Sequence, residues 1–291
     1  MRRWFIPLCL TVGAAASAIV AHVAAAAPES VTGSAVPERA VTASHRGGGG
    51  GYFAVACGFS HRNTDDPIVF PRQPGRSHDH TYFGARSTDA FSTPASLRED
   101  GRTTCRLRAD TAAYWAPTLL VRGRAVEPLA LVAYYVRRTS DEVDPFPAGL
   151  KVVAGDARAR TAQSTRVTFW SCAVRRAARS TTIPTCPGAR RGGLRLHVNF
   201  PNCWDGERLD SANHKSHLAY SGDGACPRSH PVEVPALSLV IYYGVSGGTG
   251  TELSSGGQLS AHADFVNAWN QETLARLVDR YLNRSGFGKR R

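Results

Sequence analysis

The chain has 291 residues, of which 42% are hydrophobic, enough for one large or two small globular domains. Its formal net charge is +12, and its 35 basic residues include only three lysines, at positions 151, 215 and 289. The arginines are scattered and do not cluster with aromatic residues, which argues against a nucleic-acid-binding protein. A basic surface can still contact anionic cell walls or polysaccharides.

The N-terminal segment has the pattern of a secretory signal peptide. Two arginines precede an apolar run over 4–20, and the alanines at 24–27 supply the small residues that cleavage requires. The run is too short and too rich in Ala and Gly to predict a membrane span. We therefore predict a signal peptide at 1–27 and a secreted, extracellular mature chain without a membrane span. The two arginines allow either the general secretory or the twin-arginine route.

Composition divides the remaining chain into three parts. Residues 28–51 are rich in Ala, Pro, Ser, Thr and Gly and predict a flexible linker. A single disulfide-bonded, β-rich domain is expected over 52–284, followed by a basic tail at 285–291. Six cysteines remain after removal of the signal, and in an exported protein this even number fits three disulfides. Of the fifteen possible connectivities, sequential pairing is favoured: Cys57–Cys105, Cys172–Cys186 and Cys203–Cys226.

Short apolar runs separated by Gly and Pro turns predict a mainly β fold, with sandwich-type antiparallel sheets and long loops. The expected strands, in chain order, are 52–57, 118–121, 125–128, 129–137, 150–154, 167–174, 194–200 and 232–245. Arg122 and Gly123 form the expected turn of a hairpin. One helix is predicted at the C-terminal end. It begins after Asp264 as N-cap and continues to Leu282, and its apolar stripe packs on the sheet.

Three segments carry most of the histidines and several aspartates. In a strand over 77–84, His78 and His80 would project from the same face. Such a pair can bind one metal ion, or the two rings can simply form hydrogen bonds beneath a loop. The second segment is the loop that follows strand 194–200, and the third precedes the C-terminal helix. Their candidate residues are Asp205, Asp210, His214, His217, His262 and Asp264.

Several motifs follow one another in a specific order along the chain. They are His78-Asp79-His80, Tyr114-Trp115-Ala116-Pro117, Phe146–Leu150, Phe200–Gly206, Leu209-Asp210-Ser211, Cys226-Pro227 with His230, and His262-Ala263-Asp264-Phe265. Together they resemble the secreted bacterial and fungal family called domain of unknown function nineteen-ninety-six, over residues 53–282. The resemblance implies no established activity. Some members of that family look to be joined to carbohydrate-binding modules, which points to polysaccharide or cell-wall substrates.

The preferred hypothesis gathers the histidine-bearing segments into one site beside the Cys203 loop. A buried imidazole needs partners for its ring nitrogens, so a shared pocket is an economical explanation of imidazoles in segments far apart in the chain. The proposed ligands of a divalent metal such as zinc or copper are His78, His80, His214 and His217. The metal would activate a water molecule. The full candidate catalytic set is His78, His80, Asp205, Asp210, His214, His217, His262 and Asp264.

Other assignments stay open at this stage. Asp205 and Asp210 would serve as acid and base for glycosidic cleavage without a metal, or a histidine would activate Ser211 as a nucleophile. A non-catalytic carbohydrate- or cell-wall-binding module would present aromatic side chains to a glycan. The residues expected to contact a glycan are Trp115, Trp204, Tyr220 and His230. Alternatively, the polar groups only connect loops. The leading hypothesis is a secreted hydrolase or lyase that acts on a polysaccharide or another cell-envelope polymer.

Overall fold

A computed structural model of the chain describes residues 1, 41–44, 51–173, 177–187 and 193–284. The predicted signal peptide, apart from Met1, and the predicted basic tail lie outside the described residues. All described secondary structure belongs to one unit, Val36–Arg291. Within the predicted linker, Val41–Ser44 forms strand β1, which pairs with the first strand of the predicted domain.

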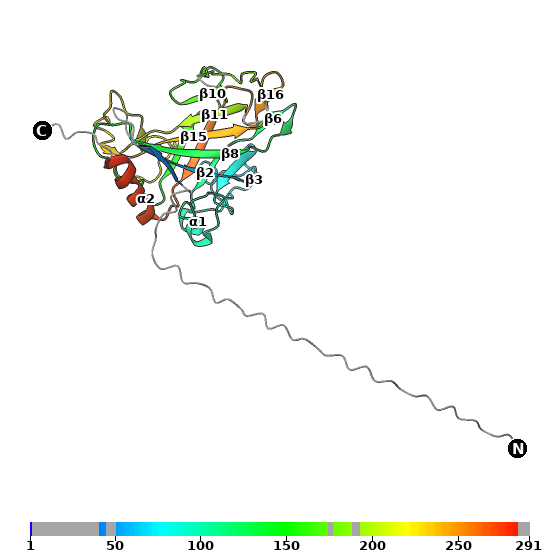
Figure 1. Cartoon of the computed structure of the whole chain (residues 1–291), viewed down its shortest axis with the longest axis horizontal. Helices are drawn as coiled ribbons and strands as arrows, with labels where there is room; N and C mark the ends of the chain where they lie inside the picture. The colour runs from blue at the N-terminus through cyan, green and yellow to red at the C-terminus, as the bar shows by residue number, and fades with distance from the viewer. Residues whose placement is uncertain (2–40, 45–50, 174–176, 188–192, 285–291) are drawn as a thin grey trace, which may run out of the picture. The chain divides into compact units, whose positions relative to one another are not determined.

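Two antiparallel sheets form most of the fold (Figure 1). The six-stranded sheet has the order β1 (Val41–Ser44), β2 (Tyr52–Cys57), β8 (Ala130–Val136), β15 (Ala236–Tyr243), β11 (Leu194–Asn199) and β10 (Thr168–Cys172). The five-stranded sheet has the order β3 (Phe59–Asn63), β4 (His80–Gly84), β5 (Ala113–Pro117), β17 (His262–Val266) and β9 (Lys151–Gly155). The predicted mainly β architecture with antiparallel sheets is confirmed.

Two three-stranded sheets complete the β structure. One contains β16 (Thr251–Leu253), β6 (Leu119–Val121) and β7 (Arg124–Ala125), and the other contains β13 (Leu218–Ala219), β12 (Cys203–Trp204) and β14 (Val232–Glu233). The predicted hairpin between β6 and β7 is confirmed. Its turn residues Arg122 and Gly123 both have positive φ, 50° and 72°, as the two-residue turn that matches strand twist requires.

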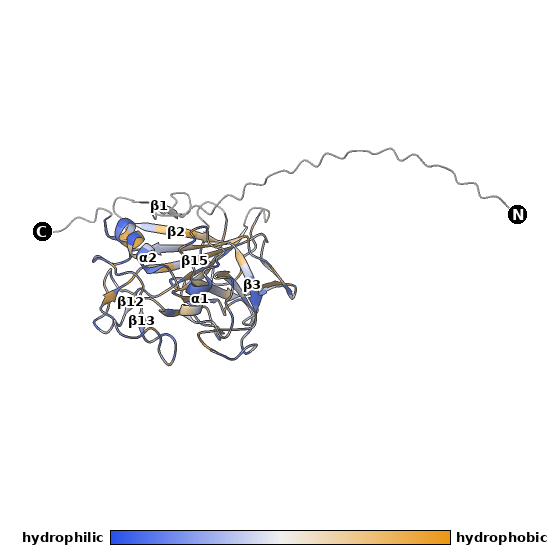
Figure 2. Ribbon diagram, turned by 90° about the horizontal axis from the view of Figure 1, so that it is seen from below, coloured by the Kyte–Doolittle hydropathy of each residue, from blue (hydrophilic) through white to orange (hydrophobic). Residues whose placement is uncertain are grey.

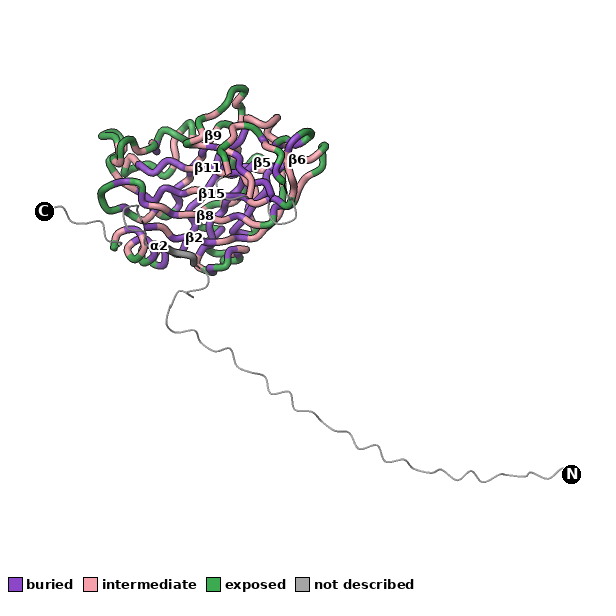
Figure 3. Tube along the Cα trace, turned by 45° about the horizontal axis from the view of Figure 1, so that its top comes forward, coloured by how far each residue is buried: buried purple, intermediate pink, exposed green. Residues whose placement is uncertain are grey.

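The main core lies between the two large sheets, where the strands are largely buried (Figure 3). Buried and half-buried residues alternate along β8, so one face of this strand points inward. Tyr135 of β8 stacks on Phe53 with ring centroids 4.6 Å apart. Its hydroxyl lies 2.6 Å from the hydroxyl of Tyr114, which belongs to β5 in the other sheet. The two sheets therefore pack face to face.

Three disulfides stabilise the domain, and the predicted sequential pairing is confirmed: Cys57–Cys105, Cys172–Cys186 and Cys203–Cys226. Each such bond typically contributes about 2–4 kcal/mol to the free energy of unfolding. Three disulfides are compatible with an extracellular protein, because such bonds persist in oxidising compartments. In the part of the chain that the structure describes, no helix has the length and apolar character needed to cross a membrane.

The C-terminal helix begins later than the sequence pattern predicts. Helix α2 spans Gln271–Val278 and continues as a π-helical turn over Asp279–Asn283. Its N-cap is Asn270, which accepts a hydrogen bond from the backbone of Thr273, and not Asp264, which lies within β17. Every residue of β17 is buried. In the sequence, its apolar residues therefore look like a continuation of the apolar stripe of the helix, which explains the early predicted start. The apolar side of α2 packs on the core, as predicted (Figure 2).

A second helix, α1, spans Pro94–Asp100 and was not predicted from the sequence. It begins with a capping box, in which the side chain of Thr93 bonds the backbone of Ser96 and the side chain of Ser96 bonds the backbone of Thr93. Proline at the first helical position fits this start. Leu97 is its one buried residue and joins a small cluster on the outer face of the five-stranded sheet.

Candidate functional site

The candidate site lies on the face of the five-stranded sheet that points away from the main core. Side chains alternate along a strand, so Phe83 and Phe265 enter the core between the sheets while their neighbours face outward. The outward-facing residues include His80 in β4 and both His262 and Asp264 in β17. The segment 64–79 contributes two more residues to the same place, Asp66 and His78.

Three histidine rings meet at this face. The ring centroids of His78 and His80 are 4.2 Å apart, and the ring of His262 lies 5.0 Å from His78 and 5.8 Å from His80. One nitrogen from each ring lies within 4.8 Å of the other two. The expectation that His78 and His80 project together therefore agrees with the geometry. Their partner is His262, from a strand 180 residues later in the chain.

Hydrogen bonds set the orientation and tautomer of two of these rings. The Nδ1 atom of His80 is 2.8 Å from the carbonyl oxygen of Asp65, and Nδ1 of His262 is 2.8 Å from that of Ser260. A carbonyl oxygen only accepts, so each Nδ1 must carry the proton and each neutral ring keeps its lone pair on Nε2. Among the described residues, Nε2 of His80 and Nε2 of His78 are buried without a hydrogen-bond partner.

Two carboxylates complete the group. One oxygen of Asp66 and one of Asp264 lie within 4.8 Å of each other and of a ring nitrogen of His80. Asp264 is only 1% exposed, and neither of its oxygens has a hydrogen-bond partner in the part of the chain that the structure describes. Asp66 accepts hydrogen bonds from the backbone of Ile68 and Val69 through a single oxygen. We call His78, His80, His262, Asp66 and Asp264 the His–Asp cluster.

Burial determines the charges in the His–Asp cluster. It lowers the pKa of His78 to about 4 and that of His262 to about 3, and it places the pKa of His80 well below the usual value. The three imidazoles are therefore neutral at pH 7. Burial also raises the pKa of Asp66 to about 6 and moves the pKa of Asp264 well above its ordinary range. None of the five side chains is a cation. The charges of Lys151 and Lys215 favour the ionised forms of Asp66 and Asp264, respectively, and a divalent metal ion would add positive charge beside both carboxylates.

The histidines of the loop after β12 have different surroundings. Nδ1 of His217 is 2.9 Å from the hydroxyl of Ser211, and its Nε2 is 2.7 Å from the carbonyl oxygen of Lys151. Both ring nitrogens are used, and His217 ties this loop to β9. His214 bonds Asp210 through Nδ1 at 2.9 Å. The predicted ligand set of His78, His80, His214 and His217 is therefore not the set that the structure assembles.

A family model described as Domain of unknown function (DUF1996) matches residues 66–269. The chain belongs to this family. The match begins at Asp66 and extends beyond Asp264, so all five residues of the His–Asp cluster lie inside the DUF1996 domain. No curated protein and no solved structure matches the chain.

The other predicted site residues of the DUF1996 domain lie away from the cluster or have structural contacts. Asp205 accepts hydrogen bonds from the backbone N–H groups of Glu207 and Arg208. It also forms an ion pair with the side chain of Arg208. Asp210 contacts Lys151 at 3.5 Å as well as His214. These contacts stabilise the loop. They give no support to the hypothesis that the aspartates at positions 205 and 210 act as a paired acid and base.

The predicted glycan contacts have mixed outcomes. Trp115 is fully buried on the outer face of the five-stranded sheet, beneath the segment that contributes Asp66, so it has no surface to offer a sugar. Trp204 is half-buried and donates its ring N–H to the carbonyl of Arg208. His230 hydrogen-bonds Ser229 and the backbone of the neighbouring loop. Tyr220 alone of the four is exposed, at 41%, and it lines a surface hollow.

Asp66 was not predicted as a site residue from the sequence. It stands beside Asp65 and before Pro67, where an aspartate reads as a turn residue. Asp66 does form such a turn through one oxygen. Its second role depends on β17, almost two hundred residues away along the chain, and no local pattern signals that contact.

Proposed function

We propose that this protein binds a divalent metal ion at the His–Asp cluster and uses it to cleave a polysaccharide or another cell-envelope polymer. The observation that carries the proposal concerns His80, whose Nε2 is buried without a partner among the described residues. This residue belongs both to the group of three imidazoles and to the group with Asp66 and Asp264. A buried polar atom without a partner typically costs about 1–3 kcal/mol. A bound metal ion would remove that cost at several atoms together.

The hydrogen bonds of the rings support this assignment. Histidines that bind metals usually donate their second ring nitrogen to a carbonyl or carboxylate, which fixes the ring and its tautomer. His80 and His262 both have this arrangement through backbone carbonyls. Imidazole nitrogens with carboxylate oxygens suit zinc or copper better than calcium or magnesium, which prefer oxygen ligands.

The chemistry that follows is activation of water or of a substrate oxygen. A divalent ion with an open position lowers the pKa of bound water and polarises oxygen atoms. The expected signal peptide and the three disulfides support a secreted protein, whose substrates would lie in a cell envelope. The alternative is a glycan-binding module in which Trp115 contacts the sugar. This alternative is not favoured, because the Trp115 side chain is buried.

The test is metal-dependent cleavage. Mature protein would be treated with a chelator, reloaded with zinc or copper, and incubated with polygalacturonate, β-glucan or peptidoglycan while new chain ends are measured. We expect cleavage to vanish after chelation, to return with one of the two metals, and to be absent in His80→Ala. The matched control His217→Ala, assayed below its melting temperature, should retain cleavage. Activity that survives chelation, or that His80→Ala retains, would contradict the proposal.

A further inference from the structure

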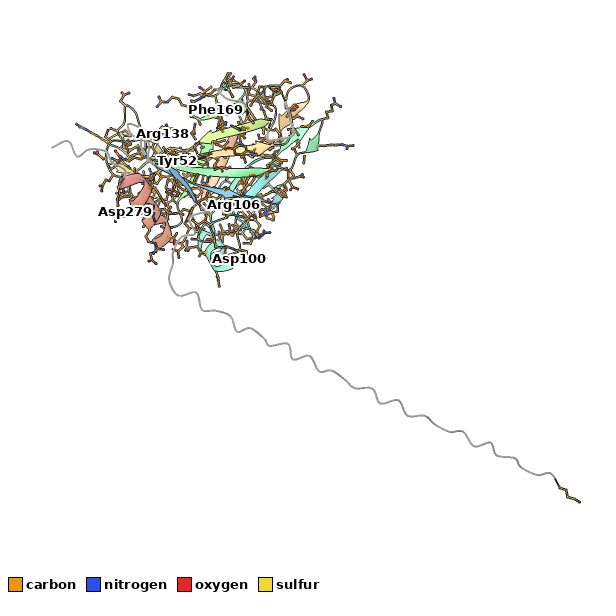
Figure 4. The ribbon with its side chains drawn as sticks, in the orientation of Figure 1. Tyr52, Asp100, Arg106, Arg138, Phe169 and Asp279 are labelled. Atoms are coloured by element: carbon orange, nitrogen blue, oxygen red, sulfur yellow. A yellow bond between two sulfur atoms is a disulfide. The ribbon has the colours of Figure 1, made fainter. Side chains whose placement is uncertain are left out.

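A basic hollow of about 750 Å³ lies on the outer face of the six-stranded sheet, at its β10 edge. Phe169 of β10, Asn199 of β11 and Ser238 of β15 line it from the sheet. Three exposed arginines surround it: Arg138, Arg166 and Arg179. Figure 4 labels Arg138 and Phe169, two of these lining residues. Asp223 is the one acidic residue among the described residues that line the hollow.

The aromatic rings in this hollow are held in place by their neighbours. The guanidinium of Arg179 lies 4.6 Å from the centroid of the Phe169 ring, and the same ring stacks on His197 at 4.2 Å. Tyr220 donates its hydroxyl to the carbonyl of Asn199 at 2.8 Å and keeps its ring exposed. Aromatic rings of this kind stack on sugars, while a guanidinium forms two parallel hydrogen bonds with a carboxylate.

A second hollow, of about 240 Å³, adjoins the first beside strand β9. The two hollows share Ser164, Val167 and Tyr220. The second is lined also by Gly155 and Lys215, and the ammonium group of Lys215 donates to the carbonyl of Gly155 at 2.6 Å. Gly155 pairs directly with His262 in the ladder between β9 and β17. The second hollow therefore lies beside the strand that pairs with β17, and Asp156 also lines it. Among the described residues, no member of the His–Asp cluster lines either hollow.

We propose that these two adjoining hollows form a groove that binds an acidic polysaccharide built from uronate sugars. Carboxylates spaced along such a chain would pair with the arginines, and the sugar faces would contact Tyr220 and Phe169. The lining also contains small hydroxyl and amide side chains, which suit sugar hydroxyls. Single-stranded nucleic acids are favoured by a series of stacking aromatics. Three aromatic residues line the hollow in the described part of the chain, Phe169, Phe200 and Tyr220, and Phe200 is only 2% exposed. The further step, that the groove presents this polymer for cleavage, rests on the proposed function.

The first test is binding of polygalacturonate to the full mature protein at low ionic strength, measured by affinity electrophoresis and calorimetry. The double variant Arg166→Gln/Arg179→Gln removes two guanidinium groups and should weaken binding by about tenfold or more, the effect of losing charge-assisted hydrogen bonds. The matched control is Arg98→Gln, because Arg98 is an exposed arginine on α1 that lines neither hollow. This control should bind like the wild type, and a neutral β-glucan should bind far more weakly than polygalacturonate.

A second measurement separates the groove from the metal site. His80→Ala should bind polygalacturonate like the wild type while it fails to cleave, because the arginines lie outside the His–Asp cluster. Arginine-dependent binding by a protein that holds no metal would support the groove and refute only the proposed function. The groove proposal is overturned if the double variant binds like the wild type or if the neutral glucan binds equally well. It is also overturned if single-stranded DNA or polyphosphate binds more tightly through the same arginines.

Discussion

Two groups of histidines in this molecule have the same side chains and opposite surroundings. In the loop after β12, both ring nitrogens of His217 have partners, and His214 is paired with Asp210. On the outer face of the five-stranded sheet, Nε2 of His80 and Nε2 of His78 lack hydrogen-bond partners among the described residues. His217 therefore needs no ligand to satisfy its ring nitrogens. The second group has buried ring nitrogens without partners, which costs free energy of folding. A ligand that binds these nitrogens is the simplest reason for the fold to retain them.

The difference teaches that residue type and sequence spacing do not separate a structural histidine from a binding one. What separates them is the number of ring nitrogens that the protein itself satisfies. A structural imidazole should therefore matter for the free energy of unfolding, and a binding imidazole for ligand affinity. Variants in the two groups should give opposite results in these two measurements.

The largest expected effect is on metal affinity. His80→Ala removes the residue shared by the imidazole group and the carboxylate group. We expect the affinity for zinc or copper to fall by more than about 100-fold, since changes to outer-shell partners alone cost roughly 10–100-fold. Calorimetric titration of chelator-treated protein measures this. His217→Ala should keep the wild-type affinity. An equal loss of metal affinity in both variants would contradict the assignment of His80 to the binding group and His217 to the structural group.

The next effect is on stability, and here the order reverses. His217→Ala removes two hydrogen bonds from a fully buried ring and leaves a cavity, which should lower the free energy of unfolding by about 2–3 kcal/mol. His214→Ala breaks one partly exposed contact with Asp210 and should cost less than about 1 kcal/mol. Chemical denaturation of metal-free protein measures both. A His217→Ala variant as stable as the wild type would show that this ring is not a structural tie.

The smallest expected effect is a gain in stability from a change inside the cluster. Burial raises the pKa of Asp264 in the folded state, so its contribution is fully present below the unfolded pKa, near 4, and is lost as pH rises toward the folded pKa. Asp264→Asn removes this dependence. In metal-free protein it should therefore increase stability at pH 8 and change little at pH 4.

Asp205→Asn is the matched control, because Asp205 accepts backbone hydrogen bonds and an ion pair in its turn. This variant should lose stability at pH 8, opposite in sign to Asp264→Asn. Thermal melts at the two pH values distinguish them. If Asp264→Asn also destabilises the metal-free protein at pH 8, its carboxylate has a structural role that the contacts do not reveal.

Much of the fold could be predicted from local sequence. Apolar segments bounded by Gly and Pro predicted the sheets, and the six cysteines predicted the disulfides. The pair Arg122-Gly123 predicted a hairpin turn. The limits appear where a strand is buried on both faces. In β17, the continuous burial hid the alternation that would have placed His262 and Asp264 together on one face. In β5, the residue type of Trp115 fits both a core position and a sugar-stacking surface, and the structure buries it.

The candidate site could be predicted only in part. The spacing of His78 and His80 was sufficient to place both rings together. The partners of the ring nitrogens were not predictable, because some of them lie far along the chain, such as the carbonyl of Lys151 for His217, whereas Ser260 is only two residues from His262. Asp65 and Ser260 orient the binding rings, whereas Lys151 completes His217. Sequence patterns report side-chain types, while these contacts depend on which loops the sheets bring together.

The most direct test of the central claim is the metal content of the purified protein. Because His80 belongs to both candidate ligand sets and its Nε2 has no partner among the described residues, the account predicts about one ion per chain. Elemental analysis of protein purified without chelator, then dialysed against zinc or copper, should find about one divalent ion in the wild type and in His217→Ala, and none in His80→Ala. A wild type that retains no ion, or a His80→Ala variant that retains as much as the wild type, would contradict the account.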